Sequence, residues 1–107
     1  MAVPKLYLLV RSDLSPGARV SQAVHGQDEF RSGHPEIHAQ WRLDSNTVAV
    51  LGVRDLEHLM ELIDLADMYE IPCSTFREPD LNYDATVLVL APHPAVKYLT
   101  AKLPLLS

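Results

Sequence analysis

The sequence predicts an α/β fold, a single-domain three-layer sandwich in which a mixed four-stranded sheet has helices on both faces. Short apolar segments rich in Val, Leu and Ile alternate along the chain with longer segments whose apolar residues recur every three or four positions. The chain has 107 residues, the usual size of one domain, and shows no internal repeat or low-complexity segment. We therefore expect one domain over residues 1–107, with its elements in the order β-α-β-α-β-β-α.

The predicted elements begin with a strand and a helix. Leu6–Val10 is an almost continuous apolar run, which is typical of a strand buried on both faces. Ser15 suits the N-cap and Pro16 the first position of a helix, which should extend to about Phe30. Helical spacing divides this helix into an apolar face and a polar face: Val20, Ala23, Val24 and Phe30 on the first, Gln22, His25 and Glu29 on the second.

The remaining elements follow from changes in the period of the apolar pattern. Asp55–Ala66 has the most regular helical spacing in the chain, with acidic residues on its other side, and Ile71 and Pro72 should end this helix. A short polar loop joins the last two strands, so we expect them to pair antiparallel. The other predicted segments are a short helix at Pro35–Trp41, strands at Thr47–Val53, Cys73–Phe76 and Ala85–Ala91, and a helix at Ala95–Leu103.

Charge and cysteine content limit the classes of function and the compartment. The formal net charge of −5 argues against a nucleic-acid partner, because phosphate contacts require Lys and Arg. However, six acidic residues lie between Asp55 and Glu70, so we expect one acidic face and a mildly basic remainder. The apolar runs are too short to cross a bilayer, and the single Cys73 cannot form an internal disulfide, so we expect a cytoplasmic protein.

The predicted topology brings several polar residues to one edge of the sheet. Strands joined by helices can run parallel, and ligands bind at the carboxyl ends of parallel strands in such sheets. This rule places Thr86 beside Glu78 and Asp80, near the first turn of the first helix. The amides expected to be free there, and to favour a phosphate or an oxyanion, are those of Gly17, Ala18 and Arg19. The cations expected around the same edge are Arg11, Arg19, Arg54 and Arg77, and a carboxylate inside such a rim suits hydrolysis of an anionic ester.

Three segments of the chain resemble blocks of the type 2 peptidyl-tRNA hydrolase family. They are LYLLVRSDL near the N-terminus, ARVSQAVHG in the first helix, and FREPDLNYDATVLVLAP across the last two strands. The resemblance covers about Lys5 to Leu103. It implies hydrolysis of the ester between a peptide and the 3′ ribose of tRNA, without a metal ion or an organic cofactor. It also implies tRNA as the partner, and it suggests a homodimer, a state known in the family.

The resemblance extends to individual residues. Gln22 and His25 match the Gln and His of the family's first-helix motif, and Thr86 matches the Thr that opens its last strand. The family has an Asp in the loop after the third strand. Alignment favours Glu78 for this position, and Asp80 is the alternative because the loop is shorter here.

The catalytic Lys of the family is the largest departure. Alignment on Gln22 and His25 puts Ala18 at its position, and the neighbouring Arg19 would point about 100° away. An arginine stays protonated, so Arg19 or Arg11 could replace the charge of the Lys but could not act as a base. The sequence therefore leaves open an esterase and a non-catalytic module that binds tRNA, a nucleotide or a protein. A regulatory domain that binds a metabolite is a third reading.

The sequence does not favour a metal site or a nucleophilic side chain. His34 and His38 have the spacing of helical metal ligands, but no third ligand is near them and Pro35 lies between them. Cys73 begins an apolar strand, where a free cysteine is usually part of the core. No serine has the sequence setting of a hydrolase nucleophile, and Ser15 already serves as an N-cap.

Overall fold

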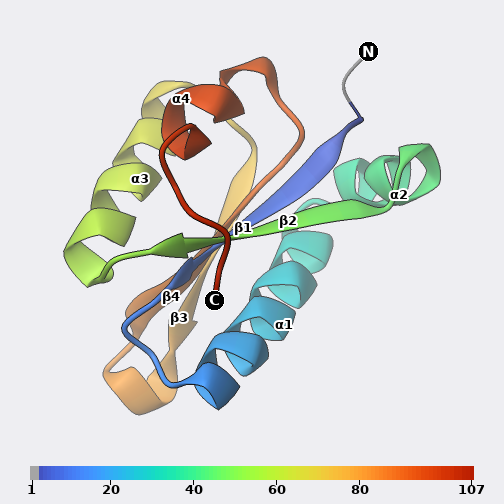
Figure 1. Cartoon of the computed structure of the whole chain (residues 1–107). Helices are drawn as coiled ribbons and strands as arrows, with labels where there is room; N and C mark the ends of the chain where they lie inside the picture. The colour runs from blue at the N-terminus through green and yellow to red at the C-terminus, as the bar shows by residue number, and fades with distance from the viewer. Residues whose placement is uncertain (1–2) are drawn as a thin grey trace.

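The computed structural model describes residues 3–107 and has a sheet of four strands in the order β2-β1-β4-β3 (Figure 1). Strand β1 (Lys5–Arg11) pairs parallel with β2 (Thr47–Val53) and antiparallel with β4 (Asp84–Leu90). Strand β3 (Cys73–Glu78) pairs antiparallel with the other edge of β4, so β4 is the one reversed strand. The predicted element order, the mixed sheet and the antiparallel final pair are confirmed.

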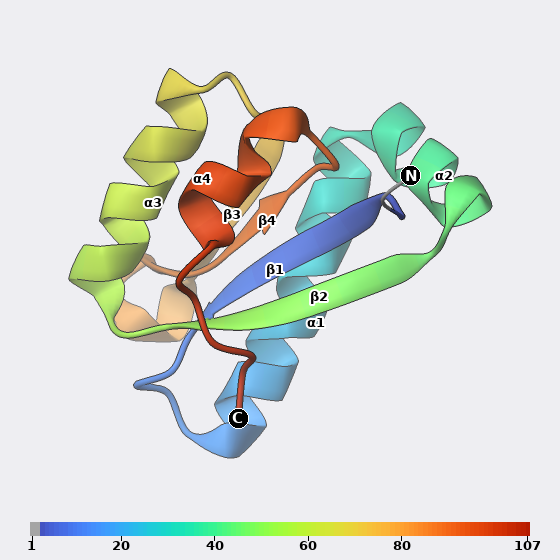
Figure 2. The ribbon, with the colours of Figure 1, turned by 45° about the horizontal axis from the view of Figure 1, so that its top comes forward.

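Helices cover both faces of the sheet, as predicted, and each face has its own apolar core (Figures 1 and 2). Phe30 and Trp41, from the first two helices, pack on one face of the sheet, and Leu59 and Leu99 pack on the other. The middle strands are buried between these layers, which explains why their sequences are apolar throughout. The helical elements of the two layers are α1 (Pro16–Gly33) and α2 (Pro35–Asp44), then α3 (Leu56–Met68), the 3-10 turn η2 (Pro94–Val96) and α4 (Lys97–Thr100).

Side-chain N-caps begin two helices, and the cap at Ser15 is the one that the sequence predicts. Ser15 is the N-cap of α1, where its side chain accepts a hydrogen bond from the amide of Ala18 at 3.3 Å, and Pro16 takes the first helical position. Asp55 caps α3 in the same way, with 2.9 Å between its side chain and the amide of His58. Both caps satisfy amides that have no acceptor inside their helix, and they fix where each helix begins.

The predicted apolar face of α1 is confirmed at Phe30, and Ala23 packs against the same core, but it is wrong at the two valines. Val20 and Val24 are 65% and 63% exposed, whereas the residues of α1 buried against the sheet are Gln22, Gly26 and Phe30. Because Gly26 has no side chain, α1 approaches β4 closely at this point and turns a small, polar side inward. The periodicity of the valines therefore indicated the wrong side of the helix.

The predicted helix at Ala95–Leu103 is shorter in the structure. The helical residues end at Thr100, and Pro104 follows soon after, where a continuing helix would lose a hydrogen bond and clash with the proline ring. Val96 and Leu99 are buried, in agreement with their helical spacing.

The segment after α4 lies along the free edge of β2 (Figures 1 and 2). The amide of Gly52 donates to the carbonyl of Pro104 at 2.8 Å, and the amide of Leu106 donates to the carbonyl of Val50 at 3.0 Å. These bonds cover part of an edge strand that would otherwise present unpaired backbone groups.

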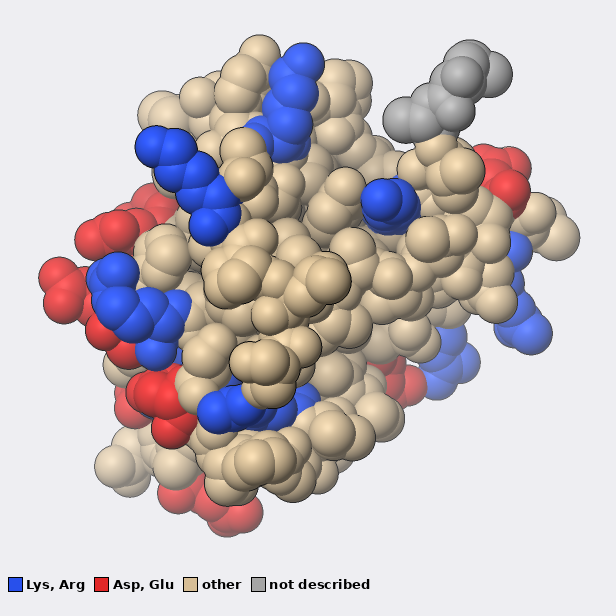
Figure 3. Space-filling view, in the orientation of Figure 1, with Lys and Arg blue, Asp and Glu red and all other residues tan. Residues whose placement is uncertain are grey.

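Acidic side chains gather on α3. Its carboxylates at Glu57, Glu61, Asp64 and Asp67 are exposed, and Figure 3 shows acidic side chains along the margin of the molecule that α3 forms. The neighbouring face, which carries α4, shows basic side chains instead. Within residues 3–107, none of the helices combines the length and the apolar character that a bilayer-spanning helix needs.

Candidate active site

A β-bulge in β4 sets the direction of the Thr86 side chain. Phe76 of β3 is opposite Val87, but Arg77 is opposite Ala85, so β4 has one residue more than β3 at this point. The extra residue is Thr86, which is fully buried and contacts α1. A bulge re-aims a side chain relative to the regular alternation of a strand, and here it turns the Thr86 hydroxyl towards α1.

Gln22 of α1 links Thr86 to Glu78. The Oγ1 atom of Thr86 donates to Gln22 Oε1 at 2.6 Å, and Gln22 Nε2 donates to Glu78 Oε1 at 3.1 Å. The orientation of the amide follows from its partners, because a carboxylate only accepts and must therefore face the NH2 group. Since Gln22 is only 5% exposed, these two bonds also offset the cost of burying its amide.

The two candidate acids lie in different surroundings. Glu78 is half-buried at the end of β3, and its bond to Gln22 occupies one carboxylate oxygen. Asp80 is exposed in the 3-10 turn η1 (Pro79–Leu81) that follows. Within the described part of the chain, Glu78 is the acid bonded to Gln22, and through Gln22 it is linked to Thr86, so the geometry favours Glu78 over Asp80.

His25 lies on the exposed surface of α1, above β3. Its ring stacks on Phe76, with 4.9 Å between the ring centroids and 18° between the ring planes. Phe76 is half-buried and His25 is exposed, so one face of the imidazole is supported while the other is open to solvent. A flat ring held in this way, three residues along the helix from Gln22, suits contact with a planar group of a ligand.

The Arg11 side chain makes structural contacts at this edge of the sheet. Its guanidinium donates to both carboxylate oxygens of Asp13, at 3.0 and 2.9 Å, and its Nη1 donates to the carbonyl of Ala85 at 3.2 Å. The hydrogen bond to Asp13 raises the pKa of Arg11, and the same contact lowers the pKa of Asp13. Arg11 thus joins the end of β1 to the start of β4 and is not a free cation.

Arg19 holds the loop between β1 and α1. Its Nε donates to the carbonyl of Leu14 at 2.8 Å and its Nη2 to the carbonyl of Ser12 at 2.6 Å, while Nη1 donates to the carbonyl of Ser107. All three nitrogens of the guanidinium are therefore occupied by backbone carbonyls.

The other expected cations also lie away from the acid. Arg54 pairs with Asp55 at 3.2 Å. Arg77 is exposed and, because side chains alternate along a strand, it points to the opposite face of β3 from Glu78. The expected rim of arginines around the acid does not form in this structure.

The first turn of α1 offers fewer free amides than expected. The amide of Ala18 bonds to the Ser15 hydroxyl, and the amide of Arg19 bonds to the Ser15 carbonyl at 2.9 Å. The expectation of free amides at Ala18 and Arg19 is wrong, because the N-cap and the first helical turn use both. The amide of Gly17 remains at the helix terminus, where the backbone dipoles leave a partial positive charge.

The chain matches a family model described as peptidyl-tRNA hydrolase PTH2 over residues 4–106. The chain belongs to the PTH2 family. No curated protein matches the sequence. Among solved structures, a protein of unknown function from Agrobacterium tumefaciens strain C58 is similar, with a TM-score of 0.74 and 15% identity over 100% of both chains. At this identity the likeness concerns the fold alone.

The PTH2 resemblance also defines what this site lacks. Ala18, at the position of the family's Lys, lies one turn before Gln22 on the same side of α1. Side chains of a helix lean towards its N-terminus, so the Gln22 side chain leans back over the turn that carries Ala18. The methyl group of Ala18 supplies no charge there, so α1 places no basic side chain beside Glu78.

Two residues that position this candidate site were not recognised in the sequence. A Cβ atom at Gly26 would lie 2.6 Å from Val87 Cγ1, so this glycine sets the distance between α1 and β4 and lets Gln22 reach Thr86. The signal was present, because a glycine in the middle of a helical pattern often has a packing reason. No comparable feature of the sequence marked Phe76, which supports His25, because a phenylalanine is an ordinary residue in a strand.

The other histidine and cysteine candidates have structural contacts. His34 Nε2 lies 2.8 Å from the carbonyl of Cys73, and the ring of His38 packs against Trp41. Burial raises the pKa of the Cys73 thiol, which disfavours the thiolate. Among the residues from 3 to 107, no three His, Cys, Asp or Glu side chains are grouped so that they could hold a metal ion.

Proposed function

We propose that the chain hydrolyses the ester bond between peptide and tRNA in peptidyl-tRNA, and so recycles tRNA. The observation that carries this proposal is the hydrogen-bonded series from Thr86 through Gln22 to Glu78. Thr86 and Gln22 stand at positions of the PTH2 motif, and together they hold a carboxylate at the edge of the sheet. Hydrolysis by a carboxylate and water needs neither a metal ion nor an organic cofactor, and tRNA is the proposed partner.

Glu78 acts as the general base in this proposal. Gln22 holds its Oε1, so Oε2 accepts a proton from a water molecule as the water oxygen attacks the carbonyl carbon of the ester. The tetrahedral intermediate collapses when the bond between the carbonyl carbon and the ribose oxygen breaks. Glu78 then returns the proton to the ribose oxygen, and the free carboxylate is restored. Thr86 acts indirectly, because it fixes the amide of Gln22.

His25 and the start of α1 bind the substrate in this proposal. The open face of the His25 ring stacks on a base at the 3′ end of the tRNA. The amide of Gly17 and the partial positive charge at the N-terminus of α1 favour a phosphate or the developing oxyanion. Because Ala18 adds no charge, we expect turnover to be slow compared with a site that has a Lys at this position.

The purified chain is expected to release N-acetylated amino acids from charged tRNA, and His25→Ala is expected to slow this release about tenfold. The loss should appear mainly in KM, because the ring contributes to binding and not to proton transfer. Initial rates measured with labelled N-acetyl-aminoacyl-tRNA test this. His25→Phe keeps a flat ring on Phe76 and should retain most of the rate.

Two outcomes would contradict this reading. Failure of the wild-type chain to release the label at high enzyme concentration would exclude the hydrolase. Equal loss in His25→Ala and His25→Phe, with kcat affected, would show that the imidazole takes part in proton transfer and does not act by stacking.

A non-catalytic module that binds tRNA, a nucleotide or a protein is the second candidate function. Ala18 is the observation that favours it, because the PTH2 resemblance puts a catalytic Lys at this position. Under this alternative the Gln22–Glu78 pair is a structural contact between α1 and β3, and the chain binds tRNA without cleaving it.

Ala18→Lys is expected to increase turnover about tenfold, since a cation one turn before Gln22 can stabilise the charge that develops near Glu78. Val20→Lys is the matched control, because it adds the same charge to the exposed side of the same helix. A gain in Ala18→Lys alone supports the hydrolase. If the wild type and both variants bind tRNA but release no peptide, the binding module is correct.

A further inference from the structure

The three lysines of the chain all lie around α4. Lys5 begins β1, Lys97 begins α4, and Lys102 follows α4 by two residues. All three are exposed, and none of them forms an ion pair within the described part of the chain. The ion pairs belong instead to three arginines: Arg11, Arg31 and Arg54. Figure 3 shows this face as basic, next to the acidic margin formed by α3.

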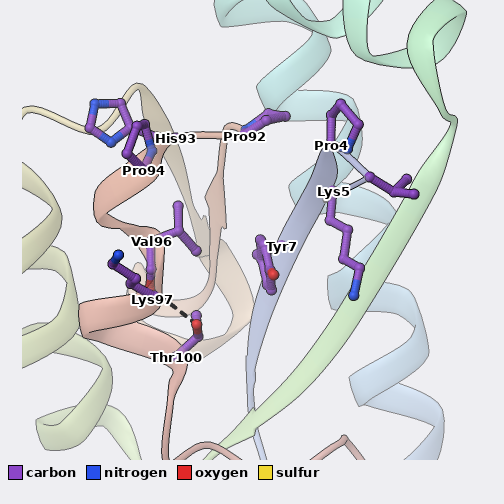
Figure 4. A pocket seen from close by; sticks show the side chains of 10 residues that line it. Pro4, Lys5, Tyr7, Pro92, His93, Pro94, Val96, Lys97 and Thr100 are labelled. Carbon is purple, nitrogen blue, oxygen red and sulfur yellow. Dashed lines mark hydrogen bonds between the residues drawn. The ribbon is translucent and has the colours of Figure 1, made fainter. Parts of the chain in front are cut away.

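A cleft of about 420 Å³ separates α4 from the start of β1 (Figure 4). Lys97 and Lys5 lie on its two sides, with the side chains of Tyr7 and Thr100 between them. His93 also lines the cleft, and its Nδ1 accepts a backbone amide at 3.0 Å, so the neutral ring carries its proton on Nε2 as a donor. Among residues 3–107, the side chains that line this cleft include donors and no carboxylate.

A second cleft of about 460 Å³ lies on the other side of α4, towards α3. Its polar and aromatic lining consists of Lys97, Lys102, Tyr98 and His58, again without a carboxylate. Lys97 lines both clefts, and its Nζ atom lies 5.4 Å from the centre of the Tyr98 ring.

We infer that the face around α4 binds the phosphate groups of RNA. This α4 face is defined by Lys5, Lys97, Lys102 and the two clefts that they line. Lysines neutralise phosphates, and hydroxyl and imidazole N–H groups add hydrogen bonds to the RNA backbone. The inference rests on the proposed function, because tRNA is the RNA taken as ligand. Its body occupies the α4 face while its 3′ end lies at Glu78.

The separation of the two sites favours a long ligand. Strand β1 runs for 7 residues from Lys5 at the first cleft to Arg11 at the edge that carries the candidate active site. This is a distance of roughly 20 Å, which a single phosphate cannot span but an RNA arm can. A membrane is a poorer fit, because the lysines surround concave clefts and not a flat apolar face.

Binding of deacylated tRNA, measured by fluorescence anisotropy over a range of salt concentrations, tests the inference. Lys97→Gln is expected to lower the slope of log affinity against log salt by about 0.7–0.9, the value for one phosphate contact. If the contact contributes nothing to affinity at 1 M salt, this change in slope corresponds to about fivefold to eightfold weaker binding at 0.1 M salt. The combined Lys5→Gln, Lys97→Gln, Lys102→Gln variant should lose about three times this slope.

Arg42→Gln is the matched control, because Arg42 is an exposed cation on α2, on the other face of the sheet. Its slope should equal that of the wild type. Equal effects of Arg42→Gln and Lys97→Gln, or no effect of the triple substitution, would overturn the inference. So would lysine-dependent binding to phosphatidylserine vesicles with no binding to tRNA.

The outcome is independent of catalysis, since deacylated tRNA has no ester to cleave. Lysine-dependent binding without hydrolysis would sustain the inference and contradict the proposed hydrolase. Hydrolysis with unchanged KM and salt slope in the triple variant would sustain the hydrolase and overturn the inference.

Discussion

Glu78→Gln is expected to lower kcat for peptidyl-tRNA hydrolysis by about 10²–10⁴-fold, with little change in KM. The amide oxygen of the new side chain can still accept the hydrogen bond from Gln22 that Glu78 Oε1 accepts at 3.1 Å, so the contact between α1 and β3 is kept. The amide cannot take a proton from water, however. Single-turnover rates with saturating enzyme separate this loss from any loss of substrate binding.

Asp80→Asn is the matched control for the same experiment. Asp80 is exposed two residues further along, and the substitution removes the same charge from the same edge of the sheet. Its kcat should stay within a few-fold of the wild type, since a solvated charge at this distance has a weak, screened influence. If Asp80→Asn lost the activity and Glu78→Gln kept it, the acid of the site would be Asp80. Full activity in both variants would exclude a carboxylate base from this loop.

The parts of the fold that could be predicted from the sequence are those set by local chemistry. Ser15 caps the first helix as expected, because its side chain can accept a hydrogen bond from an amide of the first turn. The apolar run of β1 predicted a strand buried on both faces, and the structure buries this strand between two helical layers. Strand order was not predictable, because pairing depends on contacts far apart in the sequence.

The side of α1 that faces the sheet could not be predicted in full from the spacing of its apolar residues. Apolar spacing correctly pointed to Phe30, but it also pointed to two valines that are exposed, and the helix buries Gln22 and Gly26 as well. An amide can be buried when both of its ends are bonded, and those bonds come from Thr86 and Glu78 on other elements. A rule that counts only apolar residues along one helix does not include such partners.

The candidate site was predictable in part. The PTH2 resemblance indicated Gln22 and Thr86, which the structure joins by a hydrogen bond of 2.6 Å. The bulge that aims Thr86 at α1 has no sequence signature, because it is a property of the pairing between β3 and β4. The arginines were expected to surround the acid as free cations. Arg11 and Arg19 are instead bound to groups in the loop after β1 and to carbonyls of distant segments, which sequence position alone cannot show.

Gly26 connects the packing of α1 to the chemistry of the site, and Gly26→Ala tests this connection. The added Cβ would lie 2.6 and 3.1 Å from the two methyl carbons of Val87 and 3.2 Å from Val89, both of which are fully buried and stiff at χ1. The helix must therefore shift away from β4. Overpacking of this kind costs about 1–3 kcal/mol, which is partly offset by the better helix propensity of Ala.

Gly17→Ala is the control that isolates the clash. Gly17 lies in the same helix, but a Cβ at this position meets no atom within 4 Å. Only the helix propensity of the residue therefore changes. The free energy of unfolding measured in urea should therefore be lower for Gly26→Ala than for Gly17→Ala by about 1–3 kcal/mol. Equal stability of the two variants would show that α1 adjusts without strain and that Gly26 does not fix its distance from the sheet.

The same substitution should also affect hydrolysis, because a shift of α1 separates Gln22 from Thr86. Val87→Ala removes the methyl groups that the new Cβ would meet, so it should restore part of both the stability and the activity when combined with Gly26→Ala. The double-mutant cycle is expected to give a favourable coupling of about 1 kcal/mol or more between the two positions. Additive losses would mean that the two residues act independently. In that case other contacts would set the distance between α1 and β4, and the packing of Gly26 would not control the position of Gln22 and Glu78.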